Sequence, residues 1–247
     1  MKHFSTYILP LLLLFLFACQ SNEIETTSGQ GTLVLDLYRG AIPYVRTRAE
    51  VDEGLSIHIT RADGKNFTDG RQHIEYAAGK VPNKIVLEVG TFNIDVYSPN
   101  QDTWRTENNG LGNACYKGQT QVTIGVDETT YVTYAVPMTN YAVTLTLPEL
   151  FNDLFKSYTF SLSSGGRNVS VREGEKAYFA VPEAFCYKLT ATNNDEKTSS
   201  HSPIEYPDVE AGKLYNIKYV YGTSLNTGGV DIEITDNTEH EDVDINI

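Results

Sequence analysis

The residue types that most often carry out catalysis or bind metals are scattered along this sequence. Its histidines are His3, His58, His73, His201 and His240. They show none of the short spacings that metal sites use. No serine lies in a nucleophile-elbow sequence, and no glycine-rich loop of the phosphate-binding type is present. We therefore expect a protein that is not an enzyme and that has no cofactor.

Acidic residues dominate the charge of the chain. The formal net charge is −13, whereas nucleic-acid binding requires clustered lysines and arginines. The acids between residues 231 and 244 could supply oxygen ligands for Ca²⁺. Their alternation with apolar residues instead favours solvated charge along exposed strand edges. We expect no nucleic-acid partner and no metal site.

Cys19 is the residue with the clearest chemical role. Lys2 and a short apolar run that Pro10 interrupts precede it, as in an export signal and unlike a membrane-spanning helix. Residues 16–19, Leu-Phe-Ala-Cys, resemble a bacterial lipobox. We expect residues 1–18 to be a signal peptide that is cut after Ala18, and Cys19 to be lipidated. The alternative is an ordinary signal peptide with a coincidental cysteine.

The residues that follow Cys19 indicate how the protein is attached. Residues 19–30 are polar and nearly devoid of apolar side chains, which predicts a flexible tether. Glu23 and Glu25 resemble the acidic signal that sends Bacteroidetes lipoproteins to the outer face of the outer membrane. We expect an outer-membrane lipoprotein exposed at the cell surface. Anchoring that faces the periplasm is the alternative.

The other cysteines and the long polar loop provide further candidates. An exported protein can form a disulfide between Cys115 and Cys186, but the repeat described below places them in different domains, which favours two free thiols.

Tyr97, Trp104 and Tyr116 lie in or beside the polar loop 98–114. An exposed Trp104 could stack on a sugar or anchor a protein partner. In the alternative, Trp104 folds back and closes one end of a β-sandwich.

Alternating apolar and polar residues predict β-strands that each have one buried face. The first half of the mature chain has four such sets: Leu33, Leu35 and Leu37; Leu55, Ile57 and Ile59; Phe92, Ile94 and Val96; Val132, Tyr134 and Val136. The second half repeats their order with Val143, Leu145 and Leu147; Tyr158, Phe160 and Leu162; Phe185, Tyr187 and Leu189; Ile217, Tyr219 and Tyr221. The turn sequences at 63–66 and 165–168 also correspond. We therefore expect a tandem duplication of one domain.

The repeat and the strand lengths predict an all-β protein of two tandem antiparallel β-sandwich domains. We place the first domain at residues 31–138 and the second at 139–228. Pro148 to Phe155 predicts one short helix in the second domain. Alternating apolar residues after position 229 predict a C-terminal β-hairpin over 229–247 that pairs with a sheet edge of the second domain.

Several short motifs together resemble a family of Bacteroidetes lipoproteins related to fimbrillin-like cell-adhesion proteins. They are Gly31-Thr32-Leu33-Val34-Leu35, Thr47-Arg48-Ala49, Asp63-Gly64, Gly90-Thr91-Phe92 and Tyr116-Lys117-Gly118. Gly90-Thr91-Phe92 is also similar to a strand start in transthyretin-like sandwiches. The resemblance implies transthyretin-like or Ig-like sandwiches and a structural or adhesive role.

The resemblance also implies a processing site. In pilin relatives a trypsin-like protease cuts after an arginine that follows the first strand, and the vacated groove accepts a strand from the next subunit. Arg46 and Arg48 occupy that position here. An uncut loop bearing two arginines is the alternative.

Taken together, these features predict a non-catalytic, surface-anchored lipoprotein that acts in cell adhesion or as a fimbria-like or pilus-like component. Its partners would be the membrane, through the lipid, and other surface proteins. A surface glycan-binding lipoprotein of a polysaccharide-capture system is the alternative, with Tyr97, Trp104 and Tyr116 as its ligand-binding residues.

Overall fold

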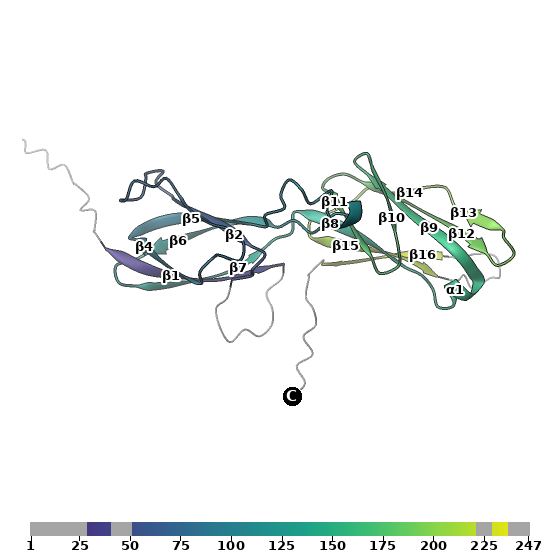
Figure 1. The fold of residues 1–247 in the computed structure, drawn as a ribbon, viewed down its shortest axis with the longest axis horizontal. Helices are drawn as coiled ribbons and strands as arrows, with labels where there is room; N and C mark the ends of the chain where they lie inside the picture. The colour runs from purple at the N-terminus through teal and green to yellow at the C-terminus, as the bar shows by residue number, and fades with distance from the viewer. Residues whose placement is uncertain (1–28, 41–50, 221–228, 237–247) are drawn as a thin grey trace, which may run out of the picture.

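The structure, a computed structural model, describes residues 29–40, 51–220 and 229–236. These residues form four β-sheets and little helix (Figure 1). The predicted all-β fold of tandem sandwiches is confirmed. Cys19, the predicted cleavage point at Ala18, and the segment with Arg46 and Arg48 lie outside the described residues.

The first sandwich packs a three-stranded sheet against a four-stranded sheet. The first sheet has the order β4-β1-β7 and consists of β1 (Gln30–Arg39), β4 (Lys84–Glu88) and β7 (Thr129–Val136). The second has the order β3-β2-β5-β6 and consists of β2 (Ser56–Arg61), β3 (Ile74–Tyr76), β5 (Gly90–Tyr97) and β6 (Lys117–Ile124). Neighbouring strands are antiparallel except β1 and β7, which are parallel.

The second sandwich repeats this topology. One sheet has the order β11-β8-β15-β16 and consists of β8 (Asn140–Thr146), β11 (Lys176–Ala180), β15 (Lys213–Val220) and β16 (Gly229–Asp236). The other consists of β9 (Phe155–Ser164), β10 (Arg167–Val171), β12 (Phe185–Asn193), β13 (Thr198–Ser200) and β14 (Ile204–Tyr206). The orders β4-β1-β7 and β11-β8-β15 correspond, including the parallel pair, here β8 with β15. The exact domain boundaries stay predictions.

Each sandwich buries its own apolar cluster between its sheets, as the alternating pattern predicts. Side chains of β1, β2 and β5 form the centre of the first cluster and are fully buried. They are Leu33, Leu35, Leu37, Ile57, Ile59, Phe92, Ile94 and Val96. The second cluster includes Val143, Phe160, Phe185 and Ile217. Removing these side chains from water provides the main driving force for folding.

The helix and the C-terminal segment differ in detail from the predictions. The helix α1 (Phe151–Leu154) is one turn long and shorter than predicted, because Leu150 adopts a left-handed conformation with φ 63°. Phe151 is buried and stacks on Phe155, while Leu150 and Leu154 are exposed. β16 pairs with β15 at the sheet edge. The predicted second strand of the hairpin lies outside the described residues.

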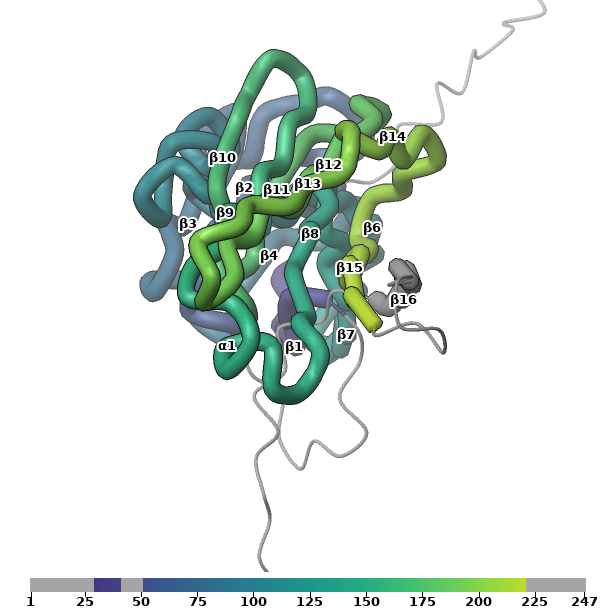
Figure 2. The backbone as a smooth tube through the Cα atoms, turned by 90° about the vertical axis from the view of Figure 1, so that its right-hand side faces the viewer, coloured from purple at the N-terminus to yellow at the C-terminus, as the bar shows by residue number. Residues whose placement is uncertain are grey.

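The two sandwiches follow each other along the long axis of the molecule (Figure 1). Viewed along that axis, the green strands of the second sandwich lie in front of the blue strands of the first (Figure 2). At the junction, each apolar cluster includes a residue from the other half of the chain. Tyr178 of β11 packs in the first cluster, and Leu111 of loop 98–114 packs in the second cluster. Within the described residues, no helix is long and apolar enough to cross a membrane.

Candidate functional site

The strand β1 holds the first sandwich together from the centre of its sheet. Five residue pairs join it to β4 and eight join it to β7. Leu33, Leu35 and Leu37 are fully buried. Because β1 is central, its loss would open a groove with backbone edges on both sides and an apolar floor.

The chain leaves β1 and returns to it at the same end of the sheet. The Gly40 N–H donates to Val136 O at 3.0 Å, and the Asp52 N–H donates to Leu37 O at 2.8 Å. Arg39 Nε donates to Asp52 Oδ2 at 3.0 Å, which forms an ion pair between the two flanks. Residues 41–50, with Arg46 and Arg48, connect these two flanks along the chain.

The start of β1 passes very close to the turn between β6 and β7. A Cβ atom added at Gly31 would meet Gly125 O and would lie 2.9 Å from Glu128 O. The Thr32 N–H donates to Glu128 O at 2.8 Å. This position therefore requires glycine because of close backbone approach, and not because of its φ angle.

Trp104 is buried, with 7% of its surface exposed. Of the two interpretations, the structure therefore agrees with the one in which the ring folds back, and not with an exposed ring. Ligand binding by Trp104 stays a prediction. The Trp104 N–H donates to Asn100 O at 2.9 Å, and its carbonyl accepts the Asn113 N–H at 3.0 Å. Two arginines, Arg105 and Arg167, lie over the ring at 5.1 and 5.9 Å.

Tyr97 and Tyr116 do not form an aromatic surface with Trp104. Tyr116 is fully buried, and its N–H donates to Ser98 Oγ at 2.9 Å. Tyr97 is half-buried at the end of β5, where its hydroxyl donates to Glu75 Oε1 at 3.0 Å. Burial, together with Glu75, raises the pKa of Tyr97. The three aromatic residues thus stabilise the first sandwich.

Glu107 organises the loop 98–114. Its carboxylate accepts hydrogen bonds from Thr103 Oγ1 at 2.7 Å, Asn113 Nδ2 at 2.8 Å and Asn100 Nδ2 at 3.2 Å. Its carbonyl accepts the Gly110 and Gly112 N–H groups, both at 3.0 Å. These hydrogen bonds, that from Thr103 first, lower the pKa of Glu107. The loop is therefore an ordered element.

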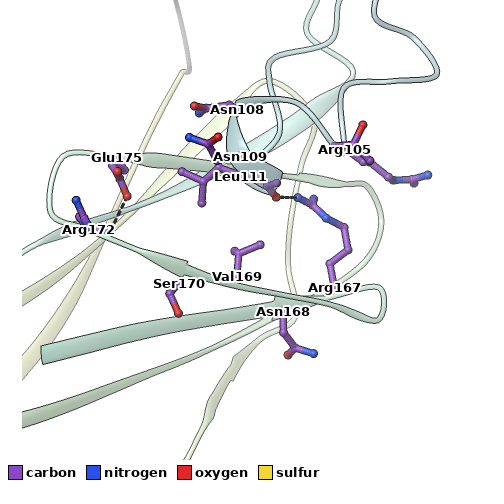
Figure 3. A pocket seen from close by; sticks show the side chains of 12 residues that line it. Arg105, Asn108, Asn109, Leu111, Arg167, Asn168, Val169, Ser170, Arg172 and Glu175 are labelled. Carbon is purple, nitrogen blue, oxygen red and sulfur yellow. Dashed lines mark hydrogen bonds between the residues drawn. The ribbon is translucent and has the colours of Figure 1, made fainter.

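A cavity of about 720 Å³ lies between this loop and the second sandwich. Figure 3 shows Arg167 and Val169 projecting from β10 toward the short helix η1 (Asn108–Gly110) and Leu111 on the opposite wall. Arg105, Arg172 and Glu175 complete the charged part of the lining. The sequence alone does not indicate this site, because its two walls are far apart in the chain and only the fold brings them together.

Arg167 fixes the loop to the second sandwich. Its Nη1 donates to Tyr178 O at 2.6 Å and its Nη2 to Gly110 O at 2.5 Å. Burial, and then the like charge of Arg105, lowers the pKa of Arg167, although the side chain stays cationic at neutral pH. Two of its five N–H donors are used in these bonds.

The remaining candidates form no reactive centre in the described part of the chain. Cys115 is buried and Cys186 is half-buried, and both are free thiols. The His58 and His73 rings lie on the outer face of the first sandwich with their centroids 4.5 Å apart and their planes tilted by 45°. Among the described residues, no group of three or more histidine, cysteine or acidic side chains is placed to hold a metal ion.

These features define a protein of two tandem β-sandwiches, with β1 between β4 and β7 in the first and a basic cavity at their junction. The profile of one protein family matches residues 29–247 of the 247-residue chain. The chain belongs to this family, which is described as Domain of unknown function (DUF4493). No curated protein matches the sequence.

Several solved structures are similar at low identity. A candidate cell adhesion protein from Bacteroides ovatus is 13% identical, with a TM-score of 0.48 over 85% of this chain and 98% of that chain. The tip fimbrial protein Mfa3 from Porphyromonas gingivalis is 9% identical, with a TM-score of 0.45 over 84% and 99%. A fimbrial assembly protein from Parabacteroides distasonis is 14% identical, with a TM-score of 0.42 over 85% and 99%. These values do not assign an activity to this chain.

Proposed function

We propose that this protein is a non-catalytic surface lipoprotein that acts in cell adhesion as a fimbria-like component. In this proposal the lipid on Cys19 holds the precursor at the outer membrane, with the sandwiches exposed at the cell surface. A trypsin-like protease then cuts after Arg46 or Arg48. The cut separates both β1 and the lipidated tether from the rest of the chain.

The observation that carries this proposal is the position of β1. It lies between β4 and β7, fills the core with three leucines, and continues to the rest of the sandwich only through residues 41–50. After a cut, β1 would be held by hydrogen bonds and apolar contacts alone. A strand from the next subunit could then form the same backbone ladder, with its alternate side chains in the positions of the leucines.

The close approach at Gly31 adds a requirement on the incoming strand. Its residue at this position must be glycine, because a Cβ atom there would meet Gly125 O. Apolar residues must then follow at the second, fourth and sixth positions, as they do at Leu33, Leu35 and Leu37. This pattern restricts which surface proteins can act as donors.

The double substitution Arg46→Gln and Arg48→Gln tests the proposal in cells. We expect the variant to reach the surface and stay there as an uncut lipoprotein, absent from purified filaments. The matched control is Arg71→Gln, at an exposed arginine elsewhere in the first sandwich, and it should assemble normally. Filaments that contain the double variant at normal levels would contradict the proposal.

A further inference from the structure

The arginines of the described residues fall into two groups. Arg39, Arg61 and Arg71 each form an ion pair, with Asp52 at 3.0 Å, Asp63 at 3.0 Å and Asp69 at 2.6 Å respectively. Arg105, Arg167 and Arg172 form none within the described residues, and all three line the cavity at the junction of the sandwiches. In a chain with 32 acidic residues and a net charge of −13, this arrangement leaves cationic groups available to an external anion.

The basic groups lie at separate places along the cavity. Arg105 and Arg167 lie at one end, where they also line a smaller adjoining pocket of about 200 Å³ with Glu183. Arg172 lies toward the other end, beside Glu175 (Figure 3). Glu175 Oε2 accepts the backbone N–H of Arg172 at 2.8 Å, and the Arg172 guanidinium has no ion pair within the part of the chain that the structure describes. The lining therefore suits a ligand with more than one anionic group.

The rest of the lining is polar, with a small apolar floor. Asn108 and Asn109 are exposed on one wall, and their backbones have φ angles of 48° and 54°. Asparagine tolerates this left-handed conformation better than most residues. Val169 and Leu111 supply the apolar part. Among the described residues that line the cavity none is aromatic, so they offer no surface on which a nucleotide base could stack.

We propose that this cavity binds an acidic oligosaccharide, that is, one whose sugars carry carboxylate or sulfate groups. Guanidinium groups form strong, directional hydrogen bonds with both kinds of anion. The amides of Asn108 and Asn109 match sugar hydroxyls, and Val169 can contact the apolar face of a ring. A volume of about 720 Å³ exceeds the need of a single inorganic ion and lies in the usual range for ligand sites.

Hydrogen bonds fix the Arg167 side chain, which preorganises the site. Its bonds to Tyr178 O and Gly110 O hold the guanidinium in place before any ligand arrives. A fixed side chain loses less entropy on binding than a free one. The proposal concerns ligand binding by the intact chain and does not depend on strand replacement, so either idea can fail without the other.

Isothermal titration calorimetry on the purified full chain tests the proposal. The probes are trigalacturonic acid for carboxylate, a heparin-derived oligosaccharide for sulfate, maltotriose as a neutral sugar, and inorganic sulfate. We expect at least one acidic oligosaccharide to bind, with affinity that falls as salt rises. The acidic probe that binds identifies the anionic group. Maltotriose should bind more weakly or not at all.

Variants locate the binding. Arg105→Gln and Arg172→Gln should each weaken binding by about tenfold or more, since each removes a charge-assisted contact. Arg71→Gln, whose arginine is already paired, should bind as the unmodified chain does. Unchanged melting temperatures would show that the variants fold. The proposal is overturned if no acidic oligosaccharide binds, if maltotriose or inorganic sulfate binds equally well, or if both cavity variants keep full affinity.

Discussion

At the scale of single residues, Trp104 gives a direct report on the loop 98–114, because it is the only tryptophan in the chain. Its burial predicts a blue-shifted emission that acrylamide quenches poorly in the folded protein. Unfolding should shift the emission to the red and make it quenchable. A red, freely quenched emission from the folded protein would show that the ring is exposed after all.

Glu107 should control the order of that loop. Glu107→Ala removes three side-chain hydrogen bonds, and we expect a loss of about 1–3 kcal/mol in local stability, seen as greater quenching of Trp104. The matched control is Asp102→Asn, an exposed acid of the same loop without a side-chain hydrogen bond among the described residues. Equal quenching in the two variants would contradict this role.

The same carboxylate predicts how the loop depends on pH. The pKa of Glu107 in the folded protein is lowered from its ordinary value of 4.5. Its contribution to stability is therefore complete above that value and is lost as the pH falls through the lower, folded-state pKa. Acrylamide quenching of the Trp104 fluorescence should increase on acidification of the unmodified chain. The increase should be smaller in the Glu107→Ala variant.

Residue-scale prediction from sequence succeeded where a local pattern decides the outcome. Alternation identified Leu33, Ile57 and Phe92 as core residues, because one strand face must be buried wherever it pairs. It could not decide the position of Trp104, which depends on a long loop returning over β11. Nor could it associate Arg105 with Arg167, because nothing local relates them.

At the scale of elements, β1 should contribute strongly to the first sandwich. Leu35 is fully buried at its centre, so Leu35→Ala should lower the free energy of unfolding by about 2–5 kcal/mol. Thr32→Ala, at a half-buried position of the same strand, is the control and should change it by much less. Chemical denaturation measures both. Equal, small effects would mean that β1 contributes little to the core.

The elements also show what periodicity leaves open. The sequence predicted the strands and the turn between β9 and β10, where Gly165 and Gly166 both have positive φ angles. It did not predict that β1 pairs with β7 in parallel, because strand direction depends on the path of the chain between them. The predicted helix was longer than α1, because the apolar residues that suggested it include Leu150, whose backbone is left-handed.

At the scale of the whole molecule, Asn140 couples the two sandwiches. This buried side chain accepts the Cys115 N–H at 3.1 Å and donates to Asn113 O at 2.9 Å. Asn140→Ala leaves both backbone groups without these partners, which should cost about 1–3 kcal/mol for each group. We expect the unmodified chain to unfold in a single calorimetric transition and the Asn140→Ala variant to unfold in two.

A matched variant separates this coupling from general destabilisation. Asn93 accepts a hydrogen bond from Gln121 at 2.9 Å on an exposed sheet face, far from the junction in the first sandwich. Asn93→Ala should keep one transition. If Asn140→Ala also unfolds in a single, unshifted transition, the junction does not couple the two cores.

In the proposed function, a strand from another subunit replaces β1. Peptide mapping by mass spectrometry of the protein in purified surface filaments tests it most directly. We predict that the assembled chain begins after Arg46 or Arg48, and that peptides from residues 31–46 are missing. Filament protein in which residues 31–48 remain intact and joined to the rest of the chain would contradict the account.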